Sequence, residues 1–418
     1  MHKIISILKN IFIRKTIKEI NFSLESYNIT TFIFTIKSIF SKNNEKINEL
    51  EKYFQNKLNI KHAIAFDFGR TGLYAIAKSI KKDSELDNII IPGFSCVVVR
   101  NSLVSAGFKV KYADVNKTTF APDLEHIQEV IDKNTKAIVI QHVFGQIANN
   151  IDEIKKEYPS IIIIEDCAHT IESKFLDNSY IGTKGDYSFF SFEQSKPISS
   201  FEGGIVVTNK DILDIKKIVS SLEIPQFKDD LLTLMKIVIT YIFYGKYIHF
   251  IGKYIVSTIY KLFKINTSMT KEELNGNFLI DTHKKLSNYK ASIILYQLKN
   301  IDNILSHRQE IVSSYNKILN FNHSNKNIMT LRYPYIVKNK KKIIKQLSSH
   351  GYILGNWFNS PIHPIDININ SLDYIVDSCP NAQQLCASMI NLPTGYKINK
   401  EEALKLGQLI KEYNDNEK

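Results

Sequence analysis

The chain of 418 residues is 44% hydrophobic and carries a formal net charge of +12, from 54 Lys and Arg against 42 Asp and Glu. These values exclude a disordered chain and predict a large core shared by about two domains. The basic excess suits phosphorylated substrates or an anionic membrane. Its lysines are dispersed and arginine is rare, so we expect no nucleic-acid binding.

The first 45 residues predict a basic, amphipathic N-terminal segment that begins "MHKIISILKNIFIRKTIKEI". No small-residue cleavage site follows it, so we expect it to be retained. The four cysteines show neither CxxC spacing nor a disulfide framework, which favours a reducing cytoplasm. No apolar run reaches the ~18 residues that span a bilayer.

Residues 46–224 alternate short β-branched runs with helical patterns such as "TGLYAIAKSI" and "DLEHIQEVIDK". The predicted strands are "HAIAF" (62–66), "NIIIP" (88–92), "KVKYADV" (109–115), "KAIVIQHVFG" (136–145), "SIIIIED" (160–166) and "GGIVVTN" (203–209). This alternation predicts a large α/β domain whose mostly parallel sheet is covered on both faces.

Ligands of such sheets bind beyond the carboxyl ends of the strands. The polar residues at those ends are Gly69 to Thr71, Pro92 to Cys96, His142, Asp166 to His169, and the turn around Lys196. We therefore expect one site along this rim.

Residues 225–275 predict an apolar and basic helical insertion. Its stretch 231–264 contains no Asp or Glu, and its lysines are at positions 236, 246, 253, 261 and 264. In one continuous helix, at ~100° per residue, they share an arc of about 100°, which is typical of a helix in a membrane interface. Breaks at Gly245 and Gly252 would instead give a helical hairpin. The alternative is a helix pair that caps the core or joins subunits, with its lysines toward water.

Residues 276–418 read as helices followed by a smaller C-terminal α/β domain. Its predicted elements are the strand "RYPYIV", the helix "KKKIIKQLSSHG" and a terminal helix at 400–413.

The stretch from Phe189 to Gly204, "FFSFEQSKPISSFEGG", places Lys196 in a Ser- and Phe-rich turn after an apolar run. Partial burial lowers the pKa of a lysine and frees its lone pair for Schiff-base chemistry. A pyridoxal phosphate bound to Lys196 would need a buried carboxylate at its ring nitrogen. Asp166 ends a predicted strand and suits this position, while Glu165 would point to the opposite face. His169 is close enough in sequence to reach the phenolic oxygen.

The phosphate of such a cofactor needs backbone N–H groups at a helix start and small hydroxyls. Gly69, Arg70 and Thr71 open a predicted helix, and Ser191 offers a further hydroxyl. Taken singly, these residues also fit a plain capped turn, an ordinary strand-end carboxylate and a core histidine. Asp166 and His169 also resemble half of a metal site, but no third ligand with convincing spacing follows, so no metal is expected.

From about residue 46 to the C-terminus the chain resembles the DegT/DnrJ/StrS-type sugar aminotransferases, pyridoxal-phosphate enzymes of fold type I. The segments that carry the resemblance are "KHAIAFDFGRTGLYAI", "IIPGFSCVVVRNSLVSAGFKVKYADV", "IIIEDCAHTIESKF", "GDYSFFSFEQSKPISSFEGGIVVTN" and "CPNAQQLCASMINLPTGYKI". The resemblance implies that Lys196 binds the cofactor and moves protons, with Asp166 at the ring nitrogen and His169 at the phenolic oxygen. Ser191, Arg70 and Thr71 fall where the family binds phosphate. The dehydratase branch has histidine in place of this lysine, so a dehydratase is less expected.

Two positions depart from the family pattern. Cys96 stands where an aromatic residue usually covers the cofactor ring, and Phe94 is the expected substitute. Where the family has an asparagine that reaches the phosphate of the neighbouring subunit, this chain has His283.

The resemblance implies a homodimer that transfers an amino group, from glutamate, to a nucleotide-linked keto-sugar for surface polysaccharide or glycoconjugate synthesis. The insertion would place it at the inner face of the membrane. A pyridoxal-phosphate enzyme for another carbonyl, such as a lipid-linked or acidic nine-carbon sugar, is the first alternative. A membrane-docking scaffold without catalysis is the second, although it would have no chemical need for Lys196, Asp166 and His169 together.

Overall fold

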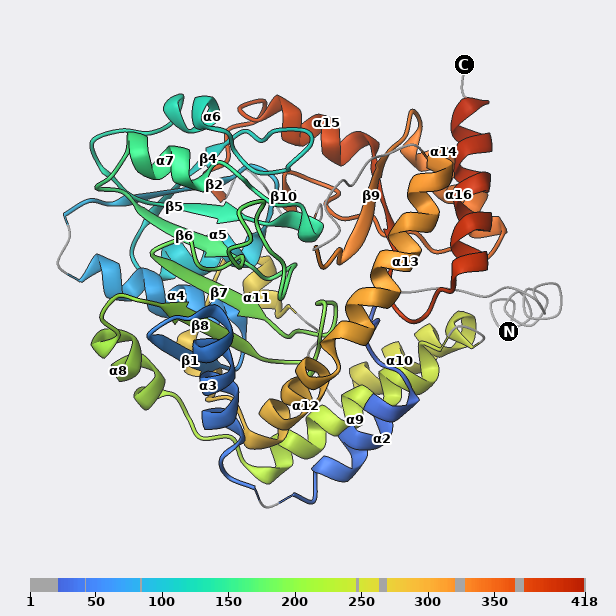
Figure 1. Cartoon of the computed structure of the whole chain (residues 1–418), viewed down its shortest axis with the longest axis horizontal. Helices are drawn as coiled ribbons and strands as arrows, with labels where there is room; N and C mark the ends of the chain where they lie inside the picture. The colour runs from blue at the N-terminus through green and yellow to red at the C-terminus, as the bar shows by residue number, and fades with distance from the viewer. Residues whose placement is uncertain are drawn as a thin grey trace.

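A seven-stranded sheet forms the left half of the molecule in the computed structural model, which describes residues 22–41, 43–82, 85–245, 248–262, 269–319, 328–364 and 372–416 (Figure 1). The strand order is β1-β8-β7-β6-β5-β2-β4. The strands are β1 (His62–Phe66), β2 (Asn88–Pro92), β4 (Lys109–Ala113), β5 (Thr135–Gln141), β6 (Ile162–Asp166), β7 (Tyr187–Ser191) and β8 (Gly204–Thr208). Strand β8 is antiparallel to both of its neighbours, β1 and β7, and all other neighbouring pairs in this sheet are parallel. The predicted α/β fold with a mostly parallel sheet is confirmed.

All six predicted strands of this domain are present. The structure adds β7, whose residues "YSFFS" lead directly into the Lys196 turn. The direction of β8 also differs from a purely parallel arrangement. The connection from β7 to β8, residues 192–203, contains no helix. A return without a crossover helix leads most simply to an antiparallel neighbour.

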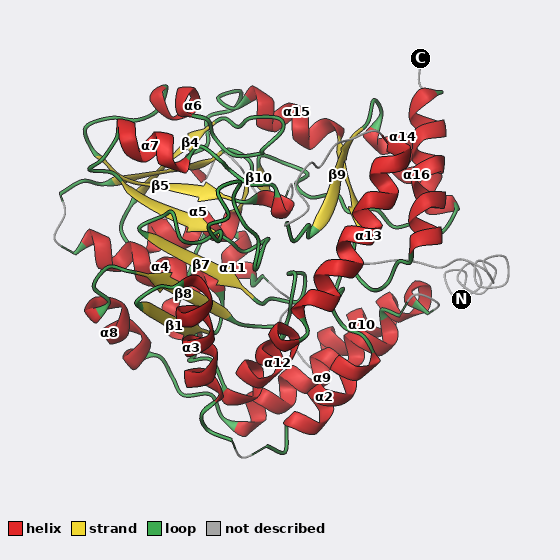
Figure 2. Ribbon diagram, viewed as in Figure 1, coloured by secondary structure: helices red, strands yellow, loops and turns green. Residues whose placement is uncertain are grey.

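Helices cover both faces of the sheet because successive strand residues point to opposite sides (Figure 2). In β2, Ile89 and Ile91 join one buried cluster and Ile90 joins the other. The first face is covered by α4 (Gly69–Lys81), α5 (Val97–Ser105), α8 (Leu213–Ser221) and α15 (Pro380–Ser388). The second face is covered by α3 (Lys46–Leu58), α6 (Leu124–Gln128), α7 (Ile151–Glu157) and α12 (Asn288–Lys299).

The C-terminal part contains the elements predicted for it. A two-stranded antiparallel sheet of β9 (Arg332–Ile336) and β11 (Met389–Pro393) shares a core with three helices, α13 (Ile301–Leu319), α14 (Lys340–Ser349) and α16 (Lys400–Asp415). A second small sheet pairs β10 (Ile362–His363) with β3 (Ser95–Cys96), so the C-terminal part contributes a strand beside the rim of the large sheet. The domain boundaries at 45, 224 and 275 stay predictions.

The insertion forms α9 (Phe227–Phe243) and α10 (His249–Leu262), followed by the short α11 (Lys271–Leu274). The break falls beside Gly245, whereas Gly252 lies inside α10. The lysines therefore do not share the arc expected for one continuous helix, and the alternative of a break at Gly245 holds. Lys236 is buried and forms an ion pair with Glu202, with 3.0 Å between Nζ and the carboxylate. Lys246 and Lys264 lie outside the described residues.

Helix α2 (Ile29–Ser38) lies beside α9 and α12, at the lower right of Figure 1. The first 21 residues of the predicted N-terminal segment lie outside the described residues. Within the described ranges, no helix is both long enough and apolar enough to cross a bilayer.

Candidate active site

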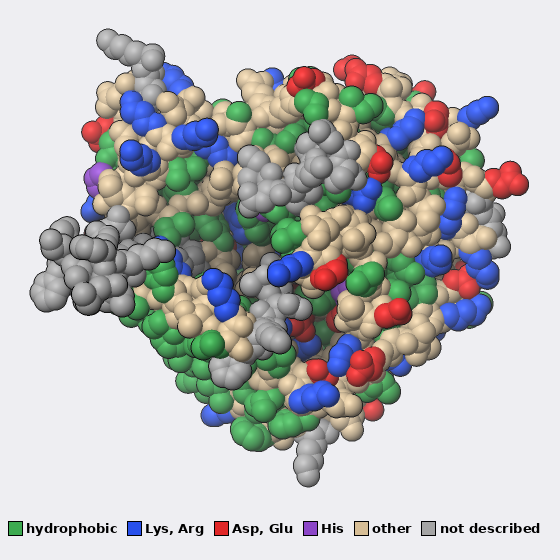
Figure 3. Space-filling view, turned by 180° about the vertical axis from the view of Figure 1, so that it is seen from behind, with side chains coloured by type: hydrophobic (Ala, Val, Ile, Leu, Met, Phe, Trp, Pro, Cys, Tyr) green, Lys and Arg blue, Asp and Glu red, His purple; other side chains and the backbone are tan. Residues whose placement is uncertain are grey.

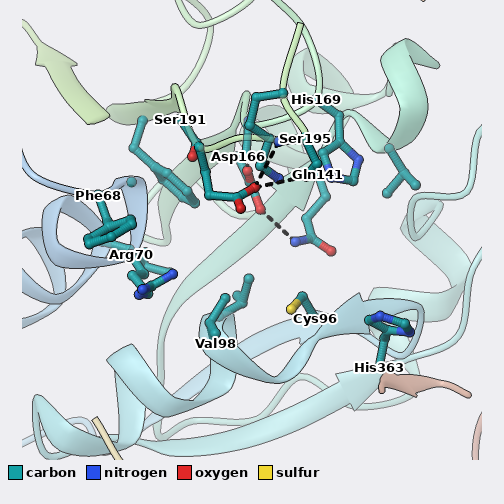
Figure 4. Close-up of a pocket in the computed structure, with 18 of the residues that line it drawn as sticks. Phe68, Arg70, Cys96, Val98, Gln141, Asp166, His169, Ser191, Ser195 and His363 are labelled. Carbon is teal, nitrogen blue, oxygen red and sulfur yellow. Dashed lines mark hydrogen bonds between the residues drawn. The ribbon is translucent and has the colours of Figure 1, made fainter. Parts of the chain in front are cut away.

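A cleft opens at the carboxyl ends of the parallel strands, and seven of the ten predicted site residues line it (Figure 4). These residues are Gly69, Arg70, Cys96, Asp166, His169, Ser191 and Lys196. They meet because β6 ends at Asp166, β7 ends at Ser191 and α4 begins at Gly69. A Cβ atom on Gly69 would lie only 3.1 Å from the Cβ of Ser191, so glycine allows the start of α4 to approach β7 closely.

Asp166 is almost fully buried, and both of its carboxylate oxygens accept hydrogen bonds. The side-chain amide of Gln141 donates to Oδ2 at 2.6 Å, and the backbone N–H of Ala168 donates to Oδ1 at 2.9 Å. Burial raises the pKa of Asp166 above its ordinary value, while these hydrogen bonds and Lys196 act in the opposite direction. The geometry holds the carboxylate in one orientation in the cleft.

Lys196 is held in a tight turn, in which its backbone N–H donates to the carbonyl of Glu193 at 3.0 Å. Burial lowers the pKa of Lys196, and the carboxylates of Glu193 and Asp166 partly oppose that shift. Glu193 is itself oriented by Ser195, whose N–H and hydroxyl donate to Oε2 at 3.2 and 2.8 Å. The turn therefore presents an amine that loses its proton more readily than an exposed lysine does.

His169 is held as a neutral imidazole. The backbone N–H of Phe144 donates to its Nδ1 at 3.1 Å, so the neutral ring carries its proton on Nε2. Burial lowers the pKa of His169 well below its ordinary value. The ring is stacked on Phe144 with centroids 5.6 Å apart.

The start of α4 provides the positive end of a helix dipole at the cleft. Its N-cap residue, Phe68, makes no capping hydrogen bond through its side chain. The Arg70 guanidinium lies over the Phe68 ring, 3.9 Å from its centroid, and Nε of Arg70 is 2.6 Å from Glu273. Backbone N–H groups at such a terminus, with an adjacent arginine, suit a bound anion.

Three predicted site residues do not line the cleft. Thr71 is fully buried, and its hydroxyl donates to Asp67 at 2.7 Å. His283 reaches the same carboxylate through Nδ1 at 2.8 Å, so it lies behind the start of α4 within its own chain. Phe94 is fully buried in an aromatic cluster, edge-on to Phe358 at 5.0 Å, and does not line the cleft. Its expected role as a substitute for a ring over the cofactor stays a prediction.

Residues distant in sequence complete the cleft and were missed. Trp357, Phe358 and His363 reach it from the C-terminal part, and His363 lies on β10 opposite Cys96 of β3. Arg332 lies in an adjoining cavity, 3.6 Å from the centroid of the Trp357 ring. The only sequence signal was that Trp357 is the single tryptophan of the chain.

Glu165 points to the opposite side of the sheet from Asp166, as strand alternation predicts. There, His142, Glu165 and Cys167 bring possible metal ligands close together. Glu165 Oε2 already accepts a hydrogen bond from Gly182 N–H at 2.9 Å and lies 3.1 Å from His142 Nε2. All three side chains are fully buried, and hydrogen bonds within the protein account for how the Glu165 carboxylate is held there.

Comparison with known proteins gives relatives that include two GDP-perosamine synthases. A GDP-perosamine synthase of Vibrio cholerae is 32% identical over 175 residues, which cover 41% of this chain and 47% of that protein. A GDP-perosamine synthase of Escherichia coli O157:H7 is 26% identical over 276 residues, 66% of this chain and 63% of that protein. The matches thus span about half to just under two thirds of these relatives.

The fold matches a solved structure over nearly its whole length. Helicobacter pylori PseC, described as an aminotransferase involved in the biosynthesis of pseudoaminic acid, aligns with a TM-score of 0.74 and 19% identity, covering 95% of this chain and 100% of that one. The model of the DegT/DnrJ/EryC1/StrS aminotransferase family matches residues 26–229 and 255–411. The chain is therefore a member of the DegT/DnrJ/EryC1/StrS aminotransferase family.

Proposed function

We propose that this protein is a pyridoxal-phosphate-dependent aminotransferase that transfers an amino group from glutamate to a nucleotide-linked keto-sugar, for surface polysaccharide or glycoconjugate synthesis. The observation that carries the proposal is that Lys196, Asp166 and His169 line one cleft at the strand ends. The sugar-linked names of its relatives support the substrate class.

The residues of the cleft fit pyridoxal phosphate. The start of α4, with Gly69 and Arg70, and the hydroxyl of Ser191 would hold the phosphate, and the buried Asp166 would face the ring nitrogen. When bound, the cofactor supplies an aldehyde that captures amino groups and a ring that withdraws electrons from them. The uncapped N-terminus of α4 favours a negative charge, and the buried carboxylate of Asp166 favours a positive one. The two ends of the cleft therefore suit the phosphate and the protonated ring nitrogen of this cofactor.

The protein side chains then hold and move protons. Burial lowers the pKa of Lys196, so its amine loses its proton more readily than an exposed lysine; in the uncharged form it can accept a proton from the substrate carbon and return it. Gln141 keeps Asp166 in orientation, and His169 offers Nε2–H as a hydrogen-bond donor toward the cleft. Trp357 and Phe358 provide apolar walls that exclude water.

Arg332 is the group that we assign to the donor carboxylate. It is 2% exposed, it lies over Trp357, and its cavity shares Glu193, Ser195 and His363 with the main cleft. Burial lowers its pKa only to about 10, so it stays charged at neutral pH. A planar guanidinium beside the cleft suits bidentate binding of a carboxylate.

We also propose a homodimer, as the family resemblance implies, and peripheral contact with the inner face of the membrane. The insertion supports the membrane contact because about half of it, residues 230–254, lies outside the family match.

The visible absorption spectrum of protein incubated with pyridoxal phosphate tests the reaction, with Lys196→Ala as the matched variant. We expect a band that borohydride removes in the wild type only, and glutamate should bleach it. A band that glutamate leaves unchanged would instead support a different donor or carbonyl substrate. Absence of any band would overturn the enzyme and favour the scaffold.

A further inference from the structure

Helix α2 is inverted with respect to ordinary amphipathic helices of globular proteins. Its buried residues are hydroxylated: Thr31, Thr35 and Ser38. Two of these hydroxyls donate to carbonyls of their own helix, Thr35 to Thr31 at 2.9 Å and Ser38 to Thr35 at 3.0 Å. Large apolar side chains on this helix and just after it are exposed instead: Ile29, Ile33, Ile36 and Phe40.

The insertion helices continue this arrangement. The inner side of α9 consists of Thr233, Lys236, Ile237 and Thr240. The exposed apolar residues of α9, α10 and the turn between them are Phe227, Leu231, Leu232, Ile242, Ile248, Ile251, Tyr254 and Leu262. Figure 3 shows apolar side chains gathered at the lower left, where these helices lie when Figure 1 is viewed from behind. We call the exposed side of α2, α9 and α10 the platform.

The helices of the platform pack closely through small and hydroxylated residues. A Cβ atom on Gly252 would collide with the carbonyl oxygen of Phe243, so glycine permits the contact of α10 with α9. The Thr240 hydroxyl lies 3.3 Å from the Tyr260 hydroxyl across the same pair. Phe32 of α2 stacks on Tyr241 of α9 with centroids 4.1 Å apart.

Small and hydroxylated residues between helices, with aliphatic residues outside, are typical of helices in contact with lipid. In water the same arrangement leaves a large apolar patch exposed, which monomeric proteins rarely tolerate without a function for it. The chemistry of the platform therefore requires a partner that is itself apolar.

The charges of the platform indicate what surrounds that apolar partner. Asp and Glu account for 42 of the 418 residues, yet neither occurs in 26–44 or 231–271, which contain α2, α10 and α9 after its first turn. Lys37 and Lys261, in the last turns of α2 and α10, are exposed. A two-fold contact between copies of this face would set lysine against lysine without a carboxylate to pair them.

We infer that the platform docks on an anionic lipid bilayer, with its aliphatic side chains in the headgroup boundary and its lysines at lipid phosphates. Residues 1–20 add five basic residues against one acidic residue, together with a run rich in isoleucine. Stable peripheral binding generally takes two such signals. The inference does not depend on the proposed reaction, because vesicle binding is measured without substrate.

Hydrogen bonds and packing join the platform directly to the segment that follows Lys196. Glu202, six residues after Lys196, accepts from Lys236 of α9 at 3.0 Å and from Lys290 of α12 at 2.5 Å. Phe201 packs in the same buried cluster as Tyr27 and Ile237. Docking would therefore hold the cleft at a fixed position beside the bilayer.

Flotation of the full-length chain with phosphatidylcholine vesicles, with and without phosphatidylglycerol, tests the inference. The double variant Ile33→Glu/Ile251→Glu changes two exposed positions and should lower vesicle binding by about tenfold or more. Lys37→Glu and Lys261→Glu should each lower binding by about fivefold, and only with the anionic lipid. Leu176→Glu, at a 78% exposed residue outside the three helices, is the control and should bind like the wild type.

Light scattering in the absence of lipid separates the alternative of a protein partner. We expect Ile33→Glu/Ile251→Glu to keep the wild-type mass. A halved mass would show that the platform joins subunits and would overturn the inference. The inference would also be overturned if the wild-type chain did not float with anionic vesicles, or if Ile33→Glu/Ile251→Glu floated as well as the wild type.

Discussion

At the scale of single residues, two carboxylates of the cleft act on the charge of one amine. Burial favours the uncharged form of Lys196, while Glu193 and Asp166 favour its charged form. Asp166 has a role in the proposed reaction at the ring nitrogen, which leaves Glu193 as the group that tunes the amine. Its fixed orientation through Ser195 suits that role.

Glu193→Gln should lower the pKa of Lys196 further, because the variant removes a negative charge that stabilises the ammonium group. The rate at which the borohydride-sensitive band appears should then reach half of its maximum at a lower pH than in the wild type. Stopped-flow absorbance over a pH series measures this midpoint, with Glu223→Gln, at an exposed residue, as control. An unchanged midpoint would contradict the assignment.

Arg332→Met should raise the KM for glutamate about tenfold to a hundredfold, because one charged hydrogen-bonding partner of the carboxylate is lost. The KM for the sugar should stay close to the wild-type value. Arg332→Lys keeps the charge but not the planar stack on Trp357, so its KM for glutamate should lie between those of the wild type and Arg332→Met. Equal changes in both KM values would show that Arg332 only supports the structure of the cleft.

At the scale of elements, Glu202 connects α9 and α12 with the turn that carries Lys196. Burial by itself would raise the pKa of Glu202, but Lys290 and Lys236 lower it to about 2 from its ordinary 4.5. A carboxyl group with a lowered pKa in the folded state stabilises that state above its unfolded pKa. This stabilisation is lost as the pH falls from about 4.5 to about 2.

Glu202→Gln should therefore cost about 3 kcal/mol of unfolding free energy at pH 7, since two buried lysines lose their charged partner. The difference from the wild type should shrink as the pH falls below 4.5 toward the folded pKa. Urea unfolding at neutral and acidic pH measures it. The exposed pair of Glu223 with Lys284 offers a control, in which Glu223→Gln should change the free energy by less than about 1 kcal/mol.

At the scale of the whole molecule, the proposed homodimer has a direct test. Light scattering of the full-length chain should give twice the mass of one 48.1 kDa chain. This mass should be reached without lipid, because the platform is assigned to the bilayer and the subunit contact to another surface. A monomeric mass at micromolar concentration would contradict the dimer.

The sequence determined much of this architecture because buried parallel strands are near-continuous β-branched runs. Six strands and the positions of Lys196, Asp166 and His169 at their ends followed from pattern alone, as did the elements "RYPYIV" and "KKKIIKQLSSHG". Strand β7 was missed since "YSFFS" continues into the lysine turn without a break in its apolar character.

Only the tertiary structure decided which distant residues share a surface. Periodicity showed an apolar and basic pattern in 231–264, but not that Lys236 turns inward to Glu202 while isoleucines turn outward. In the same way, no local pattern brings Trp357 and Arg332 to the cleft or moves His283 behind α4. Local periodicity reports that a helix has two different sides, whereas the side that is buried depends on the elements packed against it.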